Sequence, residues 1–148
     1  MATRAIIGKV DRRGDGQAIY LGHDGDPDQA GATLLEHYSE EGRVDRLIRL
    51  GSVTWLEARP EDSITYFRDH AQPWENCRPH EFGGGTERFF ARYWGVGPEW
   101  LYICTPDGWL AGKLPRRLEG AARRRSPMAG VAAAHAGASA AAIAPLPD

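Results

Sequence analysis

Residues 20–31, YLGHDGDPDQAG, hold the side chains of this chain that are best suited to chemistry. His23, Asp24 and Asp26 are close neighbours in the sequence. An imidazole nitrogen and carboxylate oxygens are common ligands of divalent metal ions in proteins. One interpretation is therefore a metal site, and with it a small metal-dependent enzyme or ligand-binding domain, built on these three side chains.

The same residues also have the pattern of a helix start. With Asp26 as the N-cap, Pro27 falls at the first helical position and Gln29 at the third, which agrees with the known preferences of capping residues. This interpretation explains the second half of the segment as architecture and requires no ligand there. It leaves three residues without a local structural reason, and we treat them as candidate binding residues: His23, Asp24 and Gly25.

A second group of polar side chains lies in the segment TYFRDH at residues 65–70. Arg68 and Asp69 are candidates for a polar binding site, although a simple ion pair beside a loop is the commoner arrangement. The chain has no G-x-S-x-G or other recognisable nucleophile motif. The residues therefore support no claim of catalysis, the balance leans against an enzyme, and we expect no cofactor.

Aromatic residues offer a different kind of candidate site. Along residues 99–104, Trp100 and Tyr102 fall on one face of the predicted strand, and Leu101 and Ile103 fall on the other. One of these faces must cover the core. If the other is exposed, Trp100 and Tyr102 form a strip that suits a protein–protein interface. The alternative is that helices cover both faces.

The elements that must position these residues follow from periodicity and turn signals. Two β-hairpins are predicted, one from residues 5–10 and 17–21 around a Gly-Asp-Gly turn, and one within EWLYICTPDGWLAGKL around Thr105-Pro106-Asp107-Gly108. Apolar residues at helical spacing predict three short helices. The helices are expected at 27–39, at 42–50 and from Thr86 onward, with 65–70 as a candidate strand.

Together these elements predict an α+β fold, with a small antiparallel sheet of about four strands and two or three short helices on one face. We expect a single domain at residues 3–114. Residues 115–148 are first basic and then rich in alanine and proline, which is typical of a disordered tail.

Charge is divided unevenly between these parts. Residues 1–111 hold 12 Lys and Arg against 18 Asp and Glu, a net charge of −6, whereas residues 112–148 hold 6 against 2, a net charge of +4. An acidic domain disfavours direct binding to nucleic acid, except weakly through the basic tail. The chain has two cysteines, no apolar stretch of membrane-spanning length and no secretory signal, so we expect a cytoplasmic protein without membrane contact.

Three segments of the chain resemble a family of small uncharacterised proteins encoded by bacteriophages, prophages and related mobile elements. The run AIYLGHDGDPDQAGATLLEHYSEEGRVDRLIRLG is similar to the family pattern IYCHWDGYPEHVG, LLEHY and LI.LG, TYFRDHAQPWE is similar to AY.RDRGE, and EWLYICTPDGWL is similar to YVYLF..G.W. The resemblance covers residues 3–111. Two positions differ from the family pattern. The family's usual Trp is replaced by Gly22 or one of its neighbours, and its usual Tyr is replaced by Asp26. The residues that fall on family positions are His23, Asp24, Gly25, Pro27 and Gly31.

The resemblance implies a context and no catalytic residues. Small accessory proteins of phages often bind and block a host machine, so the implied function is protein binding, as an anti-CRISPR-like inhibitor of a host defence system. The implied partner is a host protein complex such as a defence effector. An acidic domain is compatible with occupying the groove in which such an effector binds nucleic acid. A structural or virion-associated component is the other alternative.

Overall fold

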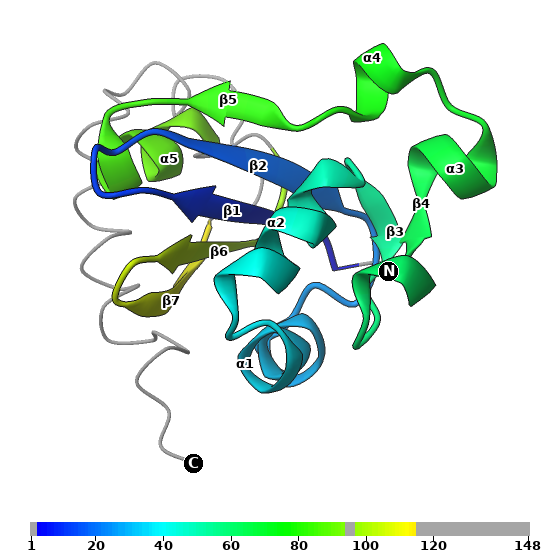
Figure 1. Cartoon of the computed structure of the whole chain (residues 1–148), viewed down its shortest axis with the longest axis horizontal. Coiled ribbons are helices and arrows are strands. Elements are labelled where there is room, and N and C mark those ends of the chain that lie inside the picture. The colour runs from blue at the N-terminus through cyan, green and yellow to red at the C-terminus, as the bar shows by residue number, and fades with distance from the viewer. Residues whose placement is uncertain (1–2, 94–96, 115–148) are drawn as a thin grey trace.

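The computed structural model describes residues 3–93 and 97–114, which form one mixed sheet with helices on both faces (Figure 1). The strands are β1 (Ala5–Val10), β2 (Gly16–Leu21), β3 (Val53–Trp55), β4 (Ile64–Thr65), β5 (His80–Phe82), β6 (Trp100–Thr105) and β7 (Gly108–Lys113). The helices are α1 (Ala32–His37), α2 (Glu41–Arg49), α3 (Tyr66–His70), α4 (Trp74–Cys77) and α5 (Gly85–Tyr93). Two short turns complete the elements, the π-helical η1 (Pro27–Gly31) and the 3-10 helix η2 (Pro60–Asp62).

The strands are ordered β4-β3-β2-β1-β6-β7, and β5 pairs with the first half of β2. The predicted four-stranded antiparallel sheet was too small, and the expectation that it is purely antiparallel was wrong. β1 lies parallel to β6, with Ala5 opposite Trp100, and β2 lies parallel to β3. Parallel strands that pair in a sheet are far apart in the chain, so no local sequence pattern predicts that they pair.

The two predicted hairpins are confirmed. In the β1–β2 turn the Asp11 carboxylate accepts hydrogen bonds from the backbone N–H groups of Arg13 (2.8 Å) and Asp15 (3.0 Å). In the β6–β7 turn the Thr105 hydroxyl accepts from the backbone N–H of Asp107 (3.1 Å) and donates to the carbonyl of Gly108 (2.8 Å). Side-chain bonds of this kind satisfy turn backbone without distant partners, which is why the sequence predicts both turns.

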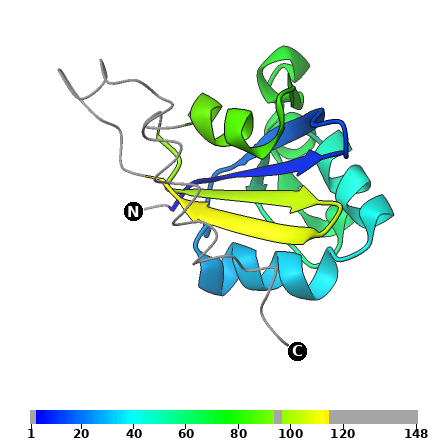
Figure 2. The same cartoon turned by 90° about the vertical axis from the view of Figure 1, so that its left-hand side faces the viewer.

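Helices cover both faces of the sheet, and the expectation of helices on one face was wrong. Alternate strand residues point to opposite faces, so Ile7 and Tyr102 pack towards α1 and α2, whereas Ile6 and Leu101 pack towards α5. Figure 2 shows α5 above the strands and α1 below them. The sequence held this signal, because AIIGKV and WLYIC are apolar at consecutive positions rather than at alternate ones.

The segment predicted as a strand at 65–70 is instead the helix α3, preceded by the two-residue strand β4. Thr65 is its N-cap, and the Thr65 hydroxyl accepts a hydrogen bond from the backbone N–H of Arg68 (2.9 Å). The Asp69 carboxylate accepts in turn from the backbone N–H of Thr65 (2.8 Å). This reciprocal cap starts the helix and overrides the β-propensity of Thr, Tyr and Phe.

Tyr38 connects α1 to the rest of the domain. Its hydroxyl donates to the Glu57 carbonyl (2.7 Å), and its own carbonyl accepts from the indole N–H of Trp109 (2.9 Å). Burial raises the pKa of Tyr38 to about 12, so the hydroxyl remains a donor at neutral pH. The bonds hold the loop after β3 against the helix layer.

The described part ends at Leu114, which is buried and donates its backbone N–H to the Glu99 carbonyl (2.7 Å). The tail expected at residues 115–148 lies outside the described residues. Among the helices of the described part, none has the length and apolar character needed to cross a membrane.

Candidate functional site: an exposed aromatic surface

The conformation of the loop after β2 is held by hydrogen bonds that its own sequence does not predict. Asp24 adopts a left-handed conformation (φ 55°), and its carbonyl accepts from the backbone N–H of Ala30 (3.2 Å). Gly25 donates its N–H to the Thr3 carbonyl (2.9 Å), and its carbonyl accepts from the Tyr102 hydroxyl (2.7 Å). Gly25 therefore ties the loop to the first described residues and to β6, whereas Asp24 ties it to the turn η1 that follows.

A side chain larger than hydrogen does not fit at Gly25. A Cβ atom added there would lie 2.8 Å from the Ala5 Cβ and 3.0 Å from the backbone carbon of Arg4. Ala5 begins β1, which is paired on both sides by β2 and β6, and Arg4 directly precedes it, so neither neighbour can move without disturbing the sheet. The glycine is required by a close approach of two backbone segments.

Asp26 occupies the predicted N-cap position, with extended backbone (φ −74°, ψ 160°) and Pro27 next. Its side chain makes no cap hydrogen bond, so the predicted side-chain cap was wrong. Its carbonyl instead accepts from the backbone N–H groups of Gln29 (3.1 Å) and Gly31 (3.3 Å). The helix that follows begins as a π-helical turn, which the capping pattern does not predict.

The metal interpretation of His23, Asp24 and Asp26 finds no support in the geometry. Within residues 3–93 and 97–114, no three His, Cys, Asp or Glu side chains converge closely enough to hold a metal ion. The His23 ring instead stacks on the Trp55 indole, with centroids 4.3 Å apart and planes 10° from parallel. The contact assigns His23 to the surface around Trp55.

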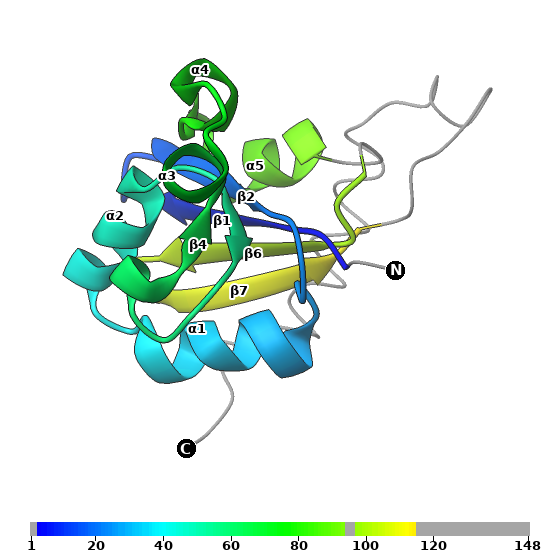
Figure 3. The ribbon, with the colours of Figure 1, turned by 90° about the vertical axis from the view of Figure 1, so that its right-hand side faces the viewer.

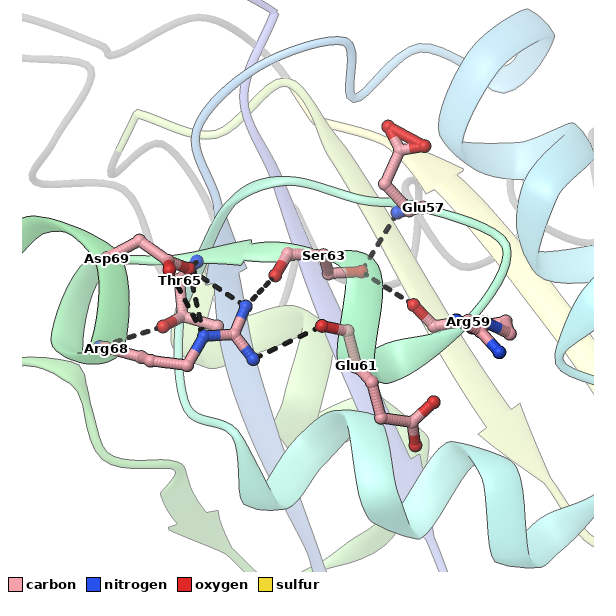
Figure 4. Close-up of polar contacts among 7 residues, drawn as sticks. All are labelled: Glu57, Arg59, Glu61, Ser63, Thr65, Arg68 and Asp69. Carbon is pink, nitrogen blue, oxygen red and sulfur yellow. Dashed lines mark hydrogen bonds and ion pairs between the residues drawn. The ribbon is translucent and has the colours of Figure 1, made fainter.

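Arg68 and Asp69 form a structural bridge rather than an open polar site (Figure 4). The Arg68 guanidinium pairs with the Asp69 carboxylate (2.9 Å) and donates to the carbonyl oxygens of Glu61 (3.3 Å) and Ser63. Figure 4 shows this guanidinium between the turn η2 and the start of α3. The Arg68 guanidinium, followed by the Thr65 N–H, holds the pKa of Asp69 below its ordinary value. Both side chains fix the backbone that leads into α3.

Trp100 and Tyr102 do not form the exposed strip that the sequence allows. Tyr102 is fully buried, and burial raises the pKa of its hydroxyl. Trp100 is half-buried against the same core, and the Lys113 ammonium lies 5.9 Å from its ring centre. The alternative, that helices cover both faces of β6, is the arrangement observed.

The large apolar side chains that are exposed come from one stretch of the described residues. They are Trp55 (38% exposed), Ile64 (38%), Phe67 (47%) and Trp74 (38%), and we call them the aromatic surface. They belong to β3, β4, α3 and α4, and Figure 3 shows β4, α3 and α4 on the side that faces the viewer. Clustered exposure of this kind is typical of interaction sites, whereas scattered apolar residues need no explanation.

The side chains of the aromatic surface are held in pairs. Trp55 and Ile64 are direct cross-strand partners on β3 and β4, and the stacked His23 supports the Trp55 ring. Phe67 and Trp74 pack edge to face, with centroids 5.2 Å apart and planes at 70°. Trp74 also rests on the backbone at Gly51, where an added Cβ would lie 3.0 Å from its Cζ3 atom. The rings are therefore oriented before any partner binds.

Sequence reasoning missed the aromatic surface, although a signal was present. Trp55, Phe67 and Trp74 lie in residues 52–85, which are otherwise rich in Pro, Gly and polar residues. Large apolar residues in a stretch with no strong helix or strand periodicity have no evident core to enter. That mismatch marks them as candidates for exposure.

A cleft of 1060 Å³ opens between the two hairpin turns and α1. Lys9 lines it, but its ammonium is paired with the carboxylates of Glu41 (2.9 Å) and Asp45 (2.5 Å). Burial raises the pKa of the Cys104 thiol, which favours the unreactive protonated form. The cleft thus offers neither a free cation at Lys9 nor an activated thiol.

Comparisons with protein-family models, with curated proteins and with solved structures give no match for this chain.

Proposed function

We propose that this protein is a non-enzymatic binding protein of a phage or mobile element, which acts by attaching its aromatic surface to a host protein complex. The observation that carries the proposal is the concentration of exposed large apolar side chains in the segment from Trp55 to Trp74. Trp and other aromatic anchors supply much of the binding energy at protein interfaces. Three of the four exposed side chains are aromatic, and exposed apolar patches on a monomer often mark interaction sites.

The fixed geometry of the aromatic surface supports the same function. The His23 ring stacks on the Trp55 indole, and the rings of Phe67 and Trp74 pack edge to face. Because these rings are already ordered, binding costs little additional side-chain entropy. A surface with rigid aromatic anchors is suited to one defined partner.

Charge favours a partner with a basic face. Residues 3–114 hold 13 Lys and Arg against 18 Asp and Glu, a net charge of −5. Complementary charge speeds the encounter of two proteins and disfavours wrong partners. We therefore propose a host defence effector that binds nucleic acid as the partner, so that the protein acts as an anti-CRISPR-like inhibitor.

Phage plating in strains that each carry one defined defence system, including CRISPR effectors with a matching spacer, tests this function. Expression of the wild-type chain should raise the plaque count in one strain. The double variant Phe67→Ser with Trp74→Ser should not, because loss of two aromatic anchors weakens binding by about 30-fold or more. The double variant Arg13→Ser with Asp107→Ser, on the two hairpin turns, is the matched control and should retain the effect.

The proposal would be contradicted if no defence system were affected, or if both double variants lost the effect equally while remaining folded. Recovery of the chain from purified phage particles in stoichiometric amounts would favour a virion component instead.

A further inference from the structure

A second pocket, of 470 Å³, lies where α4, β5 and α5 meet β2. Its polar lining comes from Gln17, Arg78, His80, Glu81 and Arg92, and Trp74 forms part of its wall. Except for Trp74, these residues are outside the aromatic surface. The volume lies within the range of pockets that hold small ligands, about 300–1,000 Å³.

The lining carries an excess of positive charge. Among the described residues, no carboxylate lies within ion-pair distance of the guanidinium group of Arg78 or Arg92. Other exposed arginines in the described part of the chain, Arg88 among them, are also without an ion pair, so the shared pocket is what sets Arg78 and Arg92 apart. Unpaired arginines that share a pocket repel one another unless an anion joins them.

The charges of Arg78 and Arg92 both affect the His80 side chain. Desolvation, and then the charges of Arg92 and Arg78, lower the pKa of its imidazole. The three residues come from different elements that line the same pocket: Arg78 at the end of α4, His80 on β5 and Arg92 on α5. The Arg92 guanidinium also lies 5.8 Å from the centre of the Tyr93 ring. The lining thus offers hydrogen-bond donors from three elements to a bound anion, and Glu81 is its single carboxylate residue.

Trp74 adds a flat apolar surface beside these charges. One part of its ring packs against Phe67 and another against Gly51, yet 38% of the residue is exposed. An indole face of this kind stacks on planar rings, including nucleobases, without requiring a particular sequence. Gln17 supplies a neutral hydrogen-bonding group on the β2 side of the pocket.

We propose that this pocket binds a nucleoside monophosphate, with the phosphate held by Arg78, Arg92 and His80 and the base stacked on Trp74. As a ligand for two arginines, a phosphate dianion is better suited than a carboxylate, because its oxygens accept several charge-assisted hydrogen bonds at once. The net charge of −5 over residues 3–114 disfavours a polynucleotide, whose further phosphates would meet acidic surface. This inference goes beyond protein binding and does not depend on it.

Calorimetric titration of the purified full chain with AMP, GMP, CMP and UMP tests the proposal. At least one nucleotide should bind, and its free nucleoside and inorganic phosphate should each bind at least about tenfold more weakly. Arg78→Gln and Arg92→Gln should each weaken nucleotide binding by about tenfold or more. Arg88→Gln is the matched control, since Arg88 is an exposed arginine on the same helix as Arg92 but outside the pocket.

The assignment would be overturned by a nucleoside that binds as tightly as its monophosphate, or by Arg88→Gln weakening binding as much as Arg92→Gln. Tighter binding of phosphotyrosine than of every nucleotide would also overturn it, and would make the pocket a phosphopeptide site. Failure of all four nucleotides to bind refutes the pocket assignment and leaves the phage-plating test of protein binding unaffected. The thermal transition of each variant shows whether it remains folded, and the two arginine variants provide independent tests.

Discussion

At the residue scale, the loop after β2 is held by long-range contacts that start from Gly25. Its N–H and carbonyl bind Thr3 and Tyr102, residues that lie at opposite ends of the described chain. Sequence reasoning could separate Asp26, Pro27 and Gln29 as a helix start because capping is local. It could not explain Gly25 or the stacked His23, since their partners come from β1, β3 and β6.

Replacement of Gly25 by alanine should destabilise the protein by about 1–3 kcal/mol, because the new methyl group overlaps Ala5 and the backbone of Arg4. The matched control is Gly42→Ala in α2, where an added Cβ meets nothing within 4 Å. That change should stabilise the protein by up to about 1 kcal/mol, because alanine favours helix. Urea denaturation of both variants measures the two effects, and an equal response would contradict the close approach at Gly25.

The ion pair of Asp69 with Arg68 predicts how stability depends on pH. The Arg68 guanidinium, and then the Thr65 N–H, place the folded pKa of Asp69 below its ordinary value of 3.8. The carboxylate therefore stabilises the folded state above the ordinary pKa, and this contribution is lost as pH falls through the folded pKa. The sign follows because the unfolded chain binds the proton more readily.

Wild type and Asp69→Asn should consequently differ in the free energy of unfolding at pH 6, and the difference should shrink as the pH falls below the ordinary pKa of 3.8 and through the lower folded pKa. Denaturation curves across this range provide the measurement. Asp107→Asn changes an exposed carboxylate of the β6–β7 turn and serves as the control, with no comparable gap at pH 6. A gap for Asp69→Asn that stayed constant down to pH 2 would refute the role of the ion pair.

At the element scale, the short helix α3 determines where the aromatic surface lies. The helix has no buried residue of its own, so its position depends on the Thr65 cap and on the Arg68 bridge to η2. Phe67 is carried on this helix and packs against Trp74 of α4. The hairpins were predictable because their turn residues act locally. The segment of α3 was mistaken for a strand because its composition favours a strand, whereas the Thr65 cap makes it helical.

Thr65→Ala should therefore cost about 0.5–2 kcal/mol of stability and loosen α3 selectively. Hydrogen exchange of the amides in Tyr66–His70 should become faster, while exchange in α2 should stay unchanged, because α2 is held by buried Val44, Leu47 and Ile48. Thr65→Ser keeps the hydroxyl and should restore most of the protection. Equal exchange in the Ala and Ser variants would show that the cap does not hold the helix.

At the scale of the whole molecule, the sheet separates two kinds of surface. The hairpin turns and the cleft beside them lie towards one end, and β3, β4, α3 and α4 lie towards the other (Figure 1). The sequence predicts the mixed α and β composition, both hairpins and three helices. It does not predict the parallel pairs β1–β6 and β2–β3, or the surface that depends on them, because these pairs join segments that are distant in the sequence, such as Ala5 with Trp100 and Leu21 with Val53.

The separation of the two ends makes the central claim directly testable by site-specific photo-crosslinking in host cells. A photoreactive phenylalanine analogue is placed at Phe67 in one variant and at Asp107, on the β6–β7 turn, in another. We expect the Phe67 probe to form an adduct with one host protein, and we expect this adduct to disappear when Trp74 is also changed to Ser. Adducts with that host protein from the Asp107 probe but not from the Phe67 probe would contradict binding through the aromatic surface.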